Sequence, residues 1–278
     1  MPDGDRMTGV GLLGCGAMGG EVAAAVRDSK SGDARLMALF DQAPGAASAL
    51  AESLGVEVQA TDSIEAFLAN PDIELVVESA SPNAVRAHAE AVLSAGKDLL
   101  LMSSGALTDP ELFVRVTTLA GEGNRRVIVP SGALGGIDAI RAVSDRLDEV
   151  TLTTTKPPRA LRGAPGFQKW ESKNLTESTV IFEGVALDAV RLFPANVNVA
   201  ATLSIAGIGP ARTTVKVIAD PQSEVNRHEI TASGDFGKFR FEMDLHPHDR
   251  NPKTSFLAVV SAIEALRSAC SSGIRIGT

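Results

Sequence analysis

The first half of the chain alternates short, continuously apolar runs with segments whose apolar residues recur at helical spacing. The runs predict strands buried on both faces, and the segments between them predict helices. The expected strands are 10–13, 35–40, 57–59, 73–78, 98–102 and 126–129. The expected helices are 21–27, 46–53, 63–68, 82–95 and 110–120, with Ser63 as an N-cap and Gly96 and Gly121 as helix ends. This order predicts an α/β fold: a Rossmann-type, doubly wound parallel sheet covered by helices on both faces.

The pattern changes after Asp148, where strands alternate apolar with polar residues, as in a sheet exposed on one face. Strands are expected at 150–155, 179–182, 212–219, 227–232 and 238–245. Helices are expected at 183–192 and 198–205, and a loop rich in proline, glycine and arginine at 156–173. These elements predict a second, α+β domain built on a mixed, largely antiparallel sheet. Thr254 and Ser255 then cap a last helix with a broad apolar stripe.

A chain of 278 residues has room for two domains with cores of their own. We expect a dinucleotide-binding domain at 1–130 and a substrate, catalytic and oligomerisation domain at 131–250. Residues 251–278 are expected to return to the first domain as a C-terminal helix.

The net charge of −8, with no basic run, argues against nucleic acid or an anionic membrane as a partner and favours a small molecule. No apolar stretch reaches the roughly 20 residues of a membrane span, and residues 1–8 lack an apolar signal core. Cys15 and Cys270 provide neither a disulfide framework nor a metal cluster. These features predict a soluble, cytoplasmic protein with reduced thiols.

Three glycines follow the first strand in the motif Gly14-x-Gly16-x-x-Gly19. The first allows a sharp turn, the second leaves room for a phosphate against the backbone, and the third allows close packing of helix on strand. Together with Ala17 and Met18, they place the N–H groups of a helix start where a dinucleotide pyrophosphate binds. Ligands of such sheets bind at the carboxyl ends of the strands.

Asp41 ends the second strand, at the interval of about 20 residues where an acidic side chain accepts hydrogen bonds from the adenosine ribose. A carboxylate there repels a 2′-phosphate. Gln42 and the lack of a neighbouring arginine also favour NAD, although NADP stays open. The alternative interpretation is a buried glycine turn beside a solvated aspartate.

Two further strand ends carry small, glycine-containing loops, 103–106 and 130–136. Their N–H groups suit a flat nicotinamide and a substrate carboxylate, and the contacts we expect come from Ser104, Gly132 and Ala133. Ala80, in the loop 79–83, lies over the same crevice. Two ordinary strand-to-helix turns are the alternative.

The sequence contains four histidines, and each predicts a different role. His88 is expected to be a surface or helix-packing residue. His246 and His248 could be metal ligands, but their spacing alone does not support a metal site, which needs further ligands with fixed geometry. A proline-rich connection before a capped helix accounts for both, so no metal site is expected. His228 lies on a strand, as a hydrogen-bonded sheet residue or as a catalyst.

Several motifs in order along the chain, from about residue 9 to about 270, resemble those of the L-aspartate dehydrogenase family. They are the glycine motif, Leu75-Val76-Val77-Glu78, Ala95-Gly96-Lys97-Asp98-Leu99, Ser103-x-Gly105-Ala106-Leu107, Pro130-Ser131-Gly132-Ala133-x-Gly135-Gly136-x-Asp138, Asn196-x-Asn198-Val199-Ala200-Ala201-Thr202, Ala219-Asp220-Pro221, Asn226-x-His228-Glu229-Ile230, Gly237-x-Phe239 and Asn251-Pro252-Lys253-Thr254-Ser255.

The resemblance implies an enzyme that converts L-aspartate and NAD or NADP reversibly into iminoaspartate, hence oxaloacetate and ammonia, in some organisms for NAD biosynthesis. It also implies that His228 is the catalytic histidine, that Asn198 contacts the cofactor, and that the turn 131–133 contacts the nicotinamide side.

An imidazole with a pKa near neutrality can take the proton of the substrate amine, or act on the water that opens the imine. The substrate carboxylates need cationic or N–H partners, and the candidates are Arg159, Arg162, Lys169, Lys173 and Lys253. Two alternatives stay open: a dehydrogenase or imine reductase acting on another small amino or hydroxy acid, and a non-catalytic NAD sensor. A homodimer or larger homo-oligomer through the second-domain sheet is also expected.

Overall fold

The computed structural model describes residues 7–194, 198–272 and 274. The amino-terminal residues 1–6, where we expected no signal core, and Asn196 of the Asn-x-Asn motif lie outside the described residues. The chain divides into two compact units. Unit 1 takes in the chain up to Pro130 together with the segment that begins at Val259, and unit 2 takes in Ser131–Ala258.

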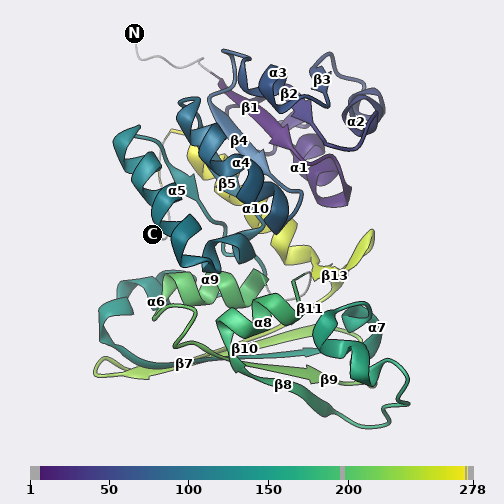
Figure 1. The fold of residues 1–278 in the computed structure, drawn as a ribbon, viewed down its shortest axis with the longest axis vertical. Coiled ribbons are helices and arrows are strands. Elements are labelled where there is room, and N and C mark those ends of the chain that lie inside the picture. Colours follow the sequence, from purple (N-terminus) through teal and green to yellow (C-terminus); the bar gives the residue numbers. More distant parts are fainter. Residues whose placement is uncertain (1–6, 195–197, 273, 275–278) are drawn as a thin grey trace. The chain divides into compact units, whose positions relative to one another are not determined.

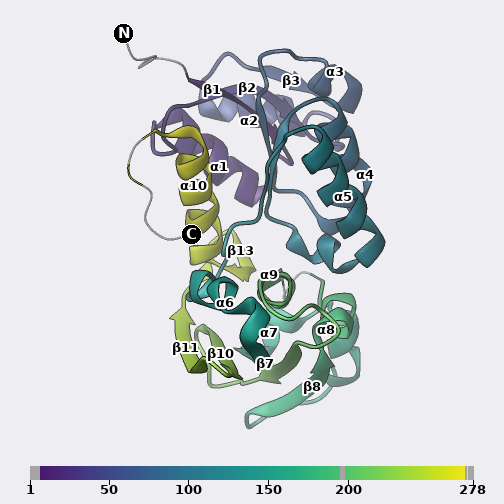
Figure 2. The ribbon, with the colours of Figure 1, turned by 90° about the vertical axis from the view of Figure 1, so that its left-hand side faces the viewer.

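Unit 1 is built on a six-stranded parallel sheet of order β3-β2-β1-β4-β5-β6. Its strands are β1 (Thr8–Leu13), β2 (Ala34–Phe40), β3 (Gln59–Thr61), β4 (Leu75–Glu78), β5 (Asp98–Leu101) and β6 (Val127–Ile128). Its helices are α1 (Ala17–Arg27), α2 (Ala46–Leu54), α3 (Ile64–Leu68), α4 (Pro82–Ser94), η1 (Ser104–Thr108), α5 (Pro110–Glu122) and most of α10 (Phe256–Cys270). Helices α1 and α10 lie on one side of the sheet and α4 and α5 on the other (Figures 1 and 2), which confirms the doubly wound fold.

The last helix contributes to the core of unit 1. Val259, Leu266 and Cys270 are buried in the same cluster as Val10 of β1 and Val22 of α1. The apolar stripe in the sequence of α10 therefore packs on the parallel sheet.

Several boundaries in unit 1 differ from those predicted. Helix α1 begins at Ala17 rather than residue 21, because the glycine turn already enters the helix, with the N–H of Gly20 donating to Gly16 O at 2.8 Å. Helix α5 passes through Gly121 and ends at Glu122, where the C-cap residue Gly123 donates its N–H to the Leu119 carbonyl. Strand β3 lies two residues later than expected. Ser63, by contrast, caps α3 as predicted, since its hydroxyl accepts a hydrogen bond from the N–H of Ala66.

Unit 2 is built on a five-stranded sheet of order β11-β10-β7-β9-β8, in which only the β7–β9 pair is parallel. The strands are β7 (Leu147–Lys156), β8 (Thr179–Val185), β9 (Thr214–Ala219), β10 (Asn226–Gly234) and β11 (Gly237–Leu245). The unit also contains α6 (Ile137–Ala142), η2 (Ser144–Arg146), α7 (Pro158–Leu161), η3 (Pro165–Trp170), α8 (Ala186–Leu192), α9 (Asn198–Ala206), β12 (Pro247–His248) and β13 (Asn251–Ser255). This confirms the mixed, largely antiparallel sheet.

One face of this sheet carries the core of unit 2. Leu152, Val217 and Ile230 are fully buried in one cluster with Ile140 of α6 and Leu203 of α9. The strands alternate buried with more exposed residues, so the opposite face is the more exposed one.

Three expectations for unit 2 were wrong. The segment 156–173 is not a plain loop, because prolines in the first turns of α7 and η3 start two short helices and Phe167 is buried in the core. Residues 183–185 continue β8 instead of opening a helix. The proline-rich connection after residue 245 forms a small hairpin from β12 and β13.

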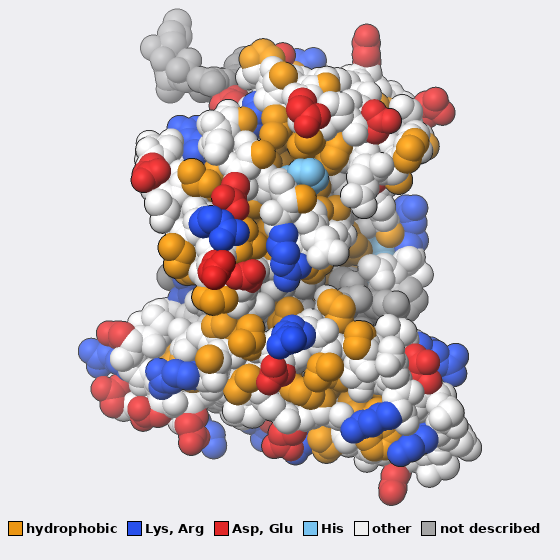
Figure 3. All heavy atoms as spheres, in the orientation of Figure 1, with side chains coloured by type: hydrophobic (Ala, Val, Ile, Leu, Met, Phe, Trp, Pro, Cys, Tyr) orange, Lys and Arg blue, Asp and Glu red, His pale blue; other side chains and the backbone are white. Residues whose placement is uncertain are grey.

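Acidic and basic side chains are interspersed over the face of the molecule drawn in Figure 3. Within the described part of the chain, no helix is both long enough and apolar enough to span a bilayer.

Candidate active site

The turn between β1 and α1 depends on glycine at two of its three motif positions. Gly14 has a φ of +104°, and a Cβ there would lie 2.7 Å from the N atom of Ala80. A Cβ on Gly19 would overlap the carbonyl oxygen of Gly14. Gly16 is different: it is exposed, and a Cβ there would have no described atom within 4 Å. The space above Gly16 is therefore open for a ligand.

The amino terminus of α1 points into this open space. Gly16 is its N-cap residue; no described side chain caps this end, and its first turn holds no acidic residue. The first N–H groups of a helix lack partners within the helix and carry the positive end of its dipole. Such an end suits a phosphate, as the sequence predicted for Ala17, Met18 and Gly19.

Asp41 is fixed at the end of β2 by two backbone donors. Its Oδ2 accepts a hydrogen bond from the N–H of Cys15 at 2.7 Å, and its Oδ1 accepts one from Ala43 at 2.9 Å. The first bond ties the carboxylate to the glycine turn. The remaining lone pairs can accept ribose hydroxyls without any rearrangement of the side chain.

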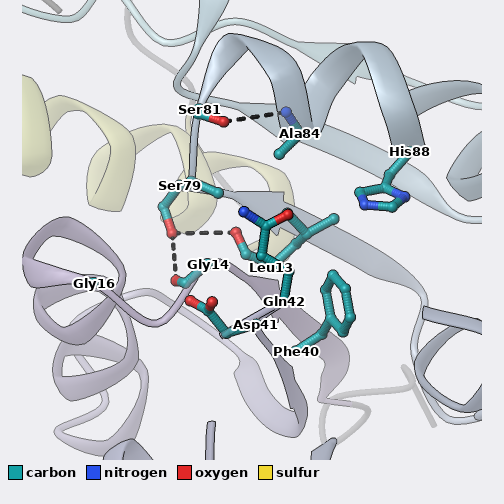
Figure 4. A pocket seen from close by; sticks show the side chains of 11 residues that line it. Leu13, Gly14, Gly16, Phe40, Asp41, Gln42, Ser79, Ser81, Ala84 and His88 are labelled. Atoms are coloured by element: carbon teal, nitrogen blue, oxygen red, sulfur yellow. Dashed lines mark hydrogen bonds between the residues drawn. The ribbon is translucent and has the colours of Figure 1, made fainter. Parts of the chain in front are cut away.

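A cavity of about 250 Å³ joins these features within unit 1. Gly14, Gly16 and Asp41, all expected from the sequence, line it (Figure 4). Ala80, also expected, is a further lining residue. Ser79 closes part of the wall, since its hydroxyl donates to the carbonyl oxygen of Gly14 at 2.9 Å. The structure thus brings the expected phosphate and ribose contacts together in one place.

His88 of α4 also lines this cavity, which the sequence analysis did not anticipate. Its ring meets the edge of Phe40 with 5.6 Å between ring centroids, so it is a helix-packing residue as expected. Burial lowers the pKa of His88, and the charge of Glu65 opposes that shift.

Glu78 holds two loops of the cavity region in place. This buried carboxylate, at the end of β4, accepts hydrogen bonds from the N–H groups of Ala80, Ser81 and Ser103 and from the Ser103 hydroxyl. Burial raises the pKa of Glu78, and these donors oppose the shift. The sequence shows an acid after three apolar residues but not that both neighbouring loops turn back onto it.

The other expected cofactor residues are divided between the units. Ser104 is buried at the start of η1 in unit 1. Gly132, Ala133 and Asn198 belong to unit 2, where Gly132 adopts a φ of +65° and Asn198 opens α9. Their roles toward a cofactor stay predictions.

A buried polar cluster lies at one end of the sheet in unit 2. It contains Thr154, Lys156, Asn226 and His228, none more than 2% exposed. His228 Nδ1 and the Thr154 hydroxyl lie 3.1 Å apart, within hydrogen-bond distance. Asn226 Nδ2 donates to the Ser255 hydroxyl at 3.2 Å.

Burial determines the protonation of this cluster. It lowers the pKa of His228 to about 3, and the positive charge of Lys156 adds to the shift. Burial also lowers the pKa of Lys156 to about 8. At neutral pH the imidazole of His228 is therefore neutral in the ligand-free protein.

The expected substrate cations are not part of this cluster. Arg159, Arg162, Lys169 and Lys173 are exposed, and the two lysines lie near the Trp170 ring at 5.4 and 4.3 Å from its centroid. The side chain of Lys253 lies outside the described residues. Lys156, which we expected at the start of a loop, is the buried cation of this cluster instead.

The remaining two histidines, His246 and His248, differ in their exposure. His246 is exposed, whereas His248 is buried and its Nδ1 accepts a hydrogen bond from the N–H of Arg250 at 3.2 Å. Among the residues that the structure describes, no three His, Cys, Asp or Glu side chains are grouped as metal ligands.

Comparison with known proteins identifies the family. The homoserine dehydrogenase NAD-binding domain family matches residues 14–130, and the aspartate dehydrogenase C-terminal family matches residues 138–269. The L-aspartate dehydrogenase of Methanosarcina mazei is 45% identical over 98% of this chain and 100% of its own length. That of Nitrosopumilus maritimus is 41% identical over the same shares. The chain belongs to the L-aspartate dehydrogenase family.

Solved structures agree with this assignment. Aspartate dehydrogenase from Thermotoga maritima superimposes with a TM-score of 0.76 and 27% identity, covering 98% of this chain and 100% of that one. Myo-inositol dehydrogenase from Lactobacillus casei, solved with NAD(H) and myo-inositol, has a TM-score of 0.56 at 16% identity, over 85% of this chain and 74% of that one. The second likeness concerns the fold alone. Family membership makes this protein an oxidoreductase with a pyridine-nucleotide-binding domain, and the glycine turn, open helix end and fixed Asp41 fit such a cofactor.

Proposed function

We propose that this protein oxidises L-aspartate with a pyridine nucleotide to iminoaspartate, which hydrolyses to oxaloacetate and ammonia, and that it also catalyses the reverse reaction. The observation that carries the proposal is full-length similarity to L-aspartate dehydrogenases at up to 45% identity among the relatives compared. The cavity around Asp41 in unit 1 and the buried His228 in unit 2 supply the two kinds of site that the reaction needs.

The preferred cofactor in this proposal is NAD. The Asp41 carboxylate is already hydrogen-bonded and faces a cavity that Gln42 also lines, with no arginine or lysine among the residues lining it. A 2′-phosphate placed there would meet a fixed negative charge and no compensating cation. NADP would therefore bind more weakly than NAD.

The nicotinamide, when bound, supplies the hydride acceptor, and the chain supplies position and proton transfer. The turn at Gly16 and the start of α1 would hold the pyrophosphate, and Asp41 would orient the adenosine ribose. His228 accepts one proton from the substrate ammonium, because hydride leaves the α-carbon only when the amine lone pair is free to form the C=N bond. The same imidazole returns the proton when water adds to the imine and ammonia leaves.

His228 suits this role because of what holds it. The Thr154 hydroxyl can fix the ring orientation through Nδ1, which leaves Nε2 for the reaction. Because the ring is buried, bulk water does not compete with the substrate as the proton donor to His228.

We further propose a homodimer or larger homo-oligomer and a cytoplasmic location with a role in NAD biosynthesis. The more exposed face of the unit 2 sheet carries cross-strand ion pairs such as Arg227–Asp244 and Arg240–Glu229 on β10 and β11, a polar surface suited to a second copy. Cys15 and Cys270 are both free thiols, as in reduced cytoplasmic proteins.

The test is formation of the reduced cofactor by the full chain with L-aspartate and a panel of other amino and hydroxy acids, each with NAD and NADP. We expect turnover with L-aspartate well above every other compound, and higher with NAD. Preferred turnover of another acid would replace the substrate assignment. Tight cofactor binding with no turnover of any compound would favour a sensor.

A further inference from the structure

We infer that the ring of His88 packs against the adenine base of the cofactor, which makes His88 a further binding residue for the dinucleotide. This inference rests on the proposed function only for the NAD cofactor, since L-aspartate has no part in it. All the residues that line the cavity beside His88 belong to unit 1. The base is the part of the adenosine that the glycine turn and Asp41 leave without a partner.

The lining residues follow the order of the groups in a dinucleotide. Gly16 and the start of α1 fit the pyrophosphate, and Asp41 fits the adenosine ribose. Figure 4 shows Gly16 at one side of the cavity and the rings of Phe40 and His88 at the opposite side, with Asp41 between them. The ribose carries the pyrophosphate and the base on different carbons, so the base extends beyond Asp41 toward the two rings.

Two aromatic rings form a corner at this side of the cavity. The ring centroids of Phe40 and His88 are 5.6 Å apart, and the ring planes are nearly perpendicular at 88°. Phe67, which is fully buried, packs against Phe40 with 5.8 Å between centroids, so the core supports the corner. A planar base fits such a corner with its face against one ring and its edge toward the other.

His88 is the ring of this pair that a ligand can cover further. Phe40 is only 4% exposed, whereas His88 is half-buried. Ala84 lies one turn before His88 on the same face of α4, and its small side chain leaves room beside the imidazole. Burial lowers the pKa of His88, and the charge of Glu65 opposes that shift, so the ring is neutral at and above neutral pH. A neutral ring packs on an uncharged base without losing the hydration of a charge.

The other lining residues also match an uncharged, planar ligand. Leu13, Phe40 and Ala84 present apolar surface, and the side-chain amide of Gln42 can both donate and accept at the nitrogen-rich edge of adenine. Among the described residues that line the cavity, Asp41 alone carries a full charge at neutral pH. A second anionic or cationic group beyond the ribose is therefore not favoured there.

The first test removes the ring with His88→Ala. Alanine is favourable within a helix and His88 is only half-buried, so the variant should fold. We expect the Kd values of NADH and ADP-ribose to rise about tenfold, because stacking on an aromatic ring contributes that much to the binding of a base. Nicotinamide mononucleotide has no adenosine, so its Kd should stay within about threefold of the wild-type value.

Two further variants are the controls. His88→Phe keeps an aromatic ring at this position and should bind ADP-ribose within about threefold of wild type. Arg86→Ala changes an exposed side chain of the same helix, which does not line the cavity and donates to Asn83 Oδ1 at 3.2 Å. It should also bind ADP-ribose within about threefold of wild type.

A second readout uses the wild-type protein and covers the case in which His88→Ala does not fold. The imidazole proton resonances of His88 can be assigned by their absence from the spectrum of His88→Phe. Saturating ADP-ribose should shift these resonances through the ring current of the base, and nicotinamide mononucleotide should leave them in place.

Four results would each overturn the inference: unchanged ADP-ribose affinity in His88→Ala, an equal loss of affinity in His88→Phe or Arg86→Ala, an equal loss for nicotinamide mononucleotide, or His88 resonances that ADP-ribose does not shift. If the wild type binds NADH and ADP-ribose as described but forms no reduced cofactor from L-aspartate, the proposed function fails and the role of His88 stands.

Discussion

Replacing two glycines of one turn separates cofactor binding from folding. At Gly16 the backbone has φ −74° and ψ −164°, values that alanine adopts readily, and a Cβ would meet no described atom within 4 Å. Gly16→Ala should therefore change the free energy of unfolding by less than about 1 kcal/mol, since the entropy gained in the unfolded chain and a slightly poorer N-cap largely cancel. The new methyl group would occupy the space that a pyrophosphate needs. We expect at least a tenfold loss of NADH affinity, about 1.4 kcal/mol.

Gly19→Ala is the contrasting variant. Its Cβ would overlap the Gly14 carbonyl oxygen and lie 2.7 Å from the Ser79 hydroxyl, so strand and helix must separate. The cost should be about 1–3 kcal/mol of unfolding free energy, together with weaker NADH binding.

Urea unfolding of the cofactor-free protein and NADH titration by fluorescence give both quantities for each variant. Gly16→Ala with wild-type NADH affinity would refute the assignment of this turn as the pyrophosphate site.

Three further predictions concern unit 1. Asp41→Ser should remove the charge that repels a 2′-phosphate, so the ratio of kcat/KM for NADP to kcat/KM for NAD should rise at least about tenfold. An unchanged ratio would show that Asp41 does not determine which cofactor is preferred. Glu78→Gln puts an NH₂ group where the carboxylate accepts hydrogen bonds, including those of Ser103, and should lower the unfolding free energy by about 1–3 kcal/mol, with the loss readable from denaturant midpoints. Burial and the Asp41 charge raise the Cys15 pKa to about 12, so the thiol should stay protonated at pH 8. It should therefore react with a disulfide reagent far more slowly than free cysteine does. Fast labelling of Cys15 in the native protein would contradict this prediction.

Much of the fold was accessible from the sequence because local pattern and tertiary environment agree. The runs around Val10, Leu39 and Val77 are apolar on both faces, and they form the centre of a parallel sheet covered on both sides. Where the local pattern and the tertiary environment disagreed, the prediction from the sequence was wrong. Gly121 looks like a helix end, yet α5 passes through it because the terminating contacts lie at Gly123.

The same contrast applies to the site. The glycine turn and Asp41 are local signals with fixed spacing, and both line the cavity of unit 1. Lys156 was not chosen as a candidate because a lysine before Pro157 and Pro158 resembles the start of a loop. The usable signal was alternation: Val150, Leu152, Thr154 and Lys156 share one phase of a strand, which placed a charge among inward-facing residues. Segments distant in the sequence bury Lys156, and a single sequence does not reveal which segments cover a residue.

In the proposed mechanism a neutral, buried His228 carries the proton in the oxidation of L-aspartate by a pyridine nucleotide. The most direct measurement is the rate of NADH formation from L-aspartate at saturating NAD in wild type and in His228→Gln, with NADH affinity measured in parallel. We predict a loss of about 100-fold or more in kcat with NADH affinity unchanged. Equal turnover in the two proteins would remove His228 from the mechanism.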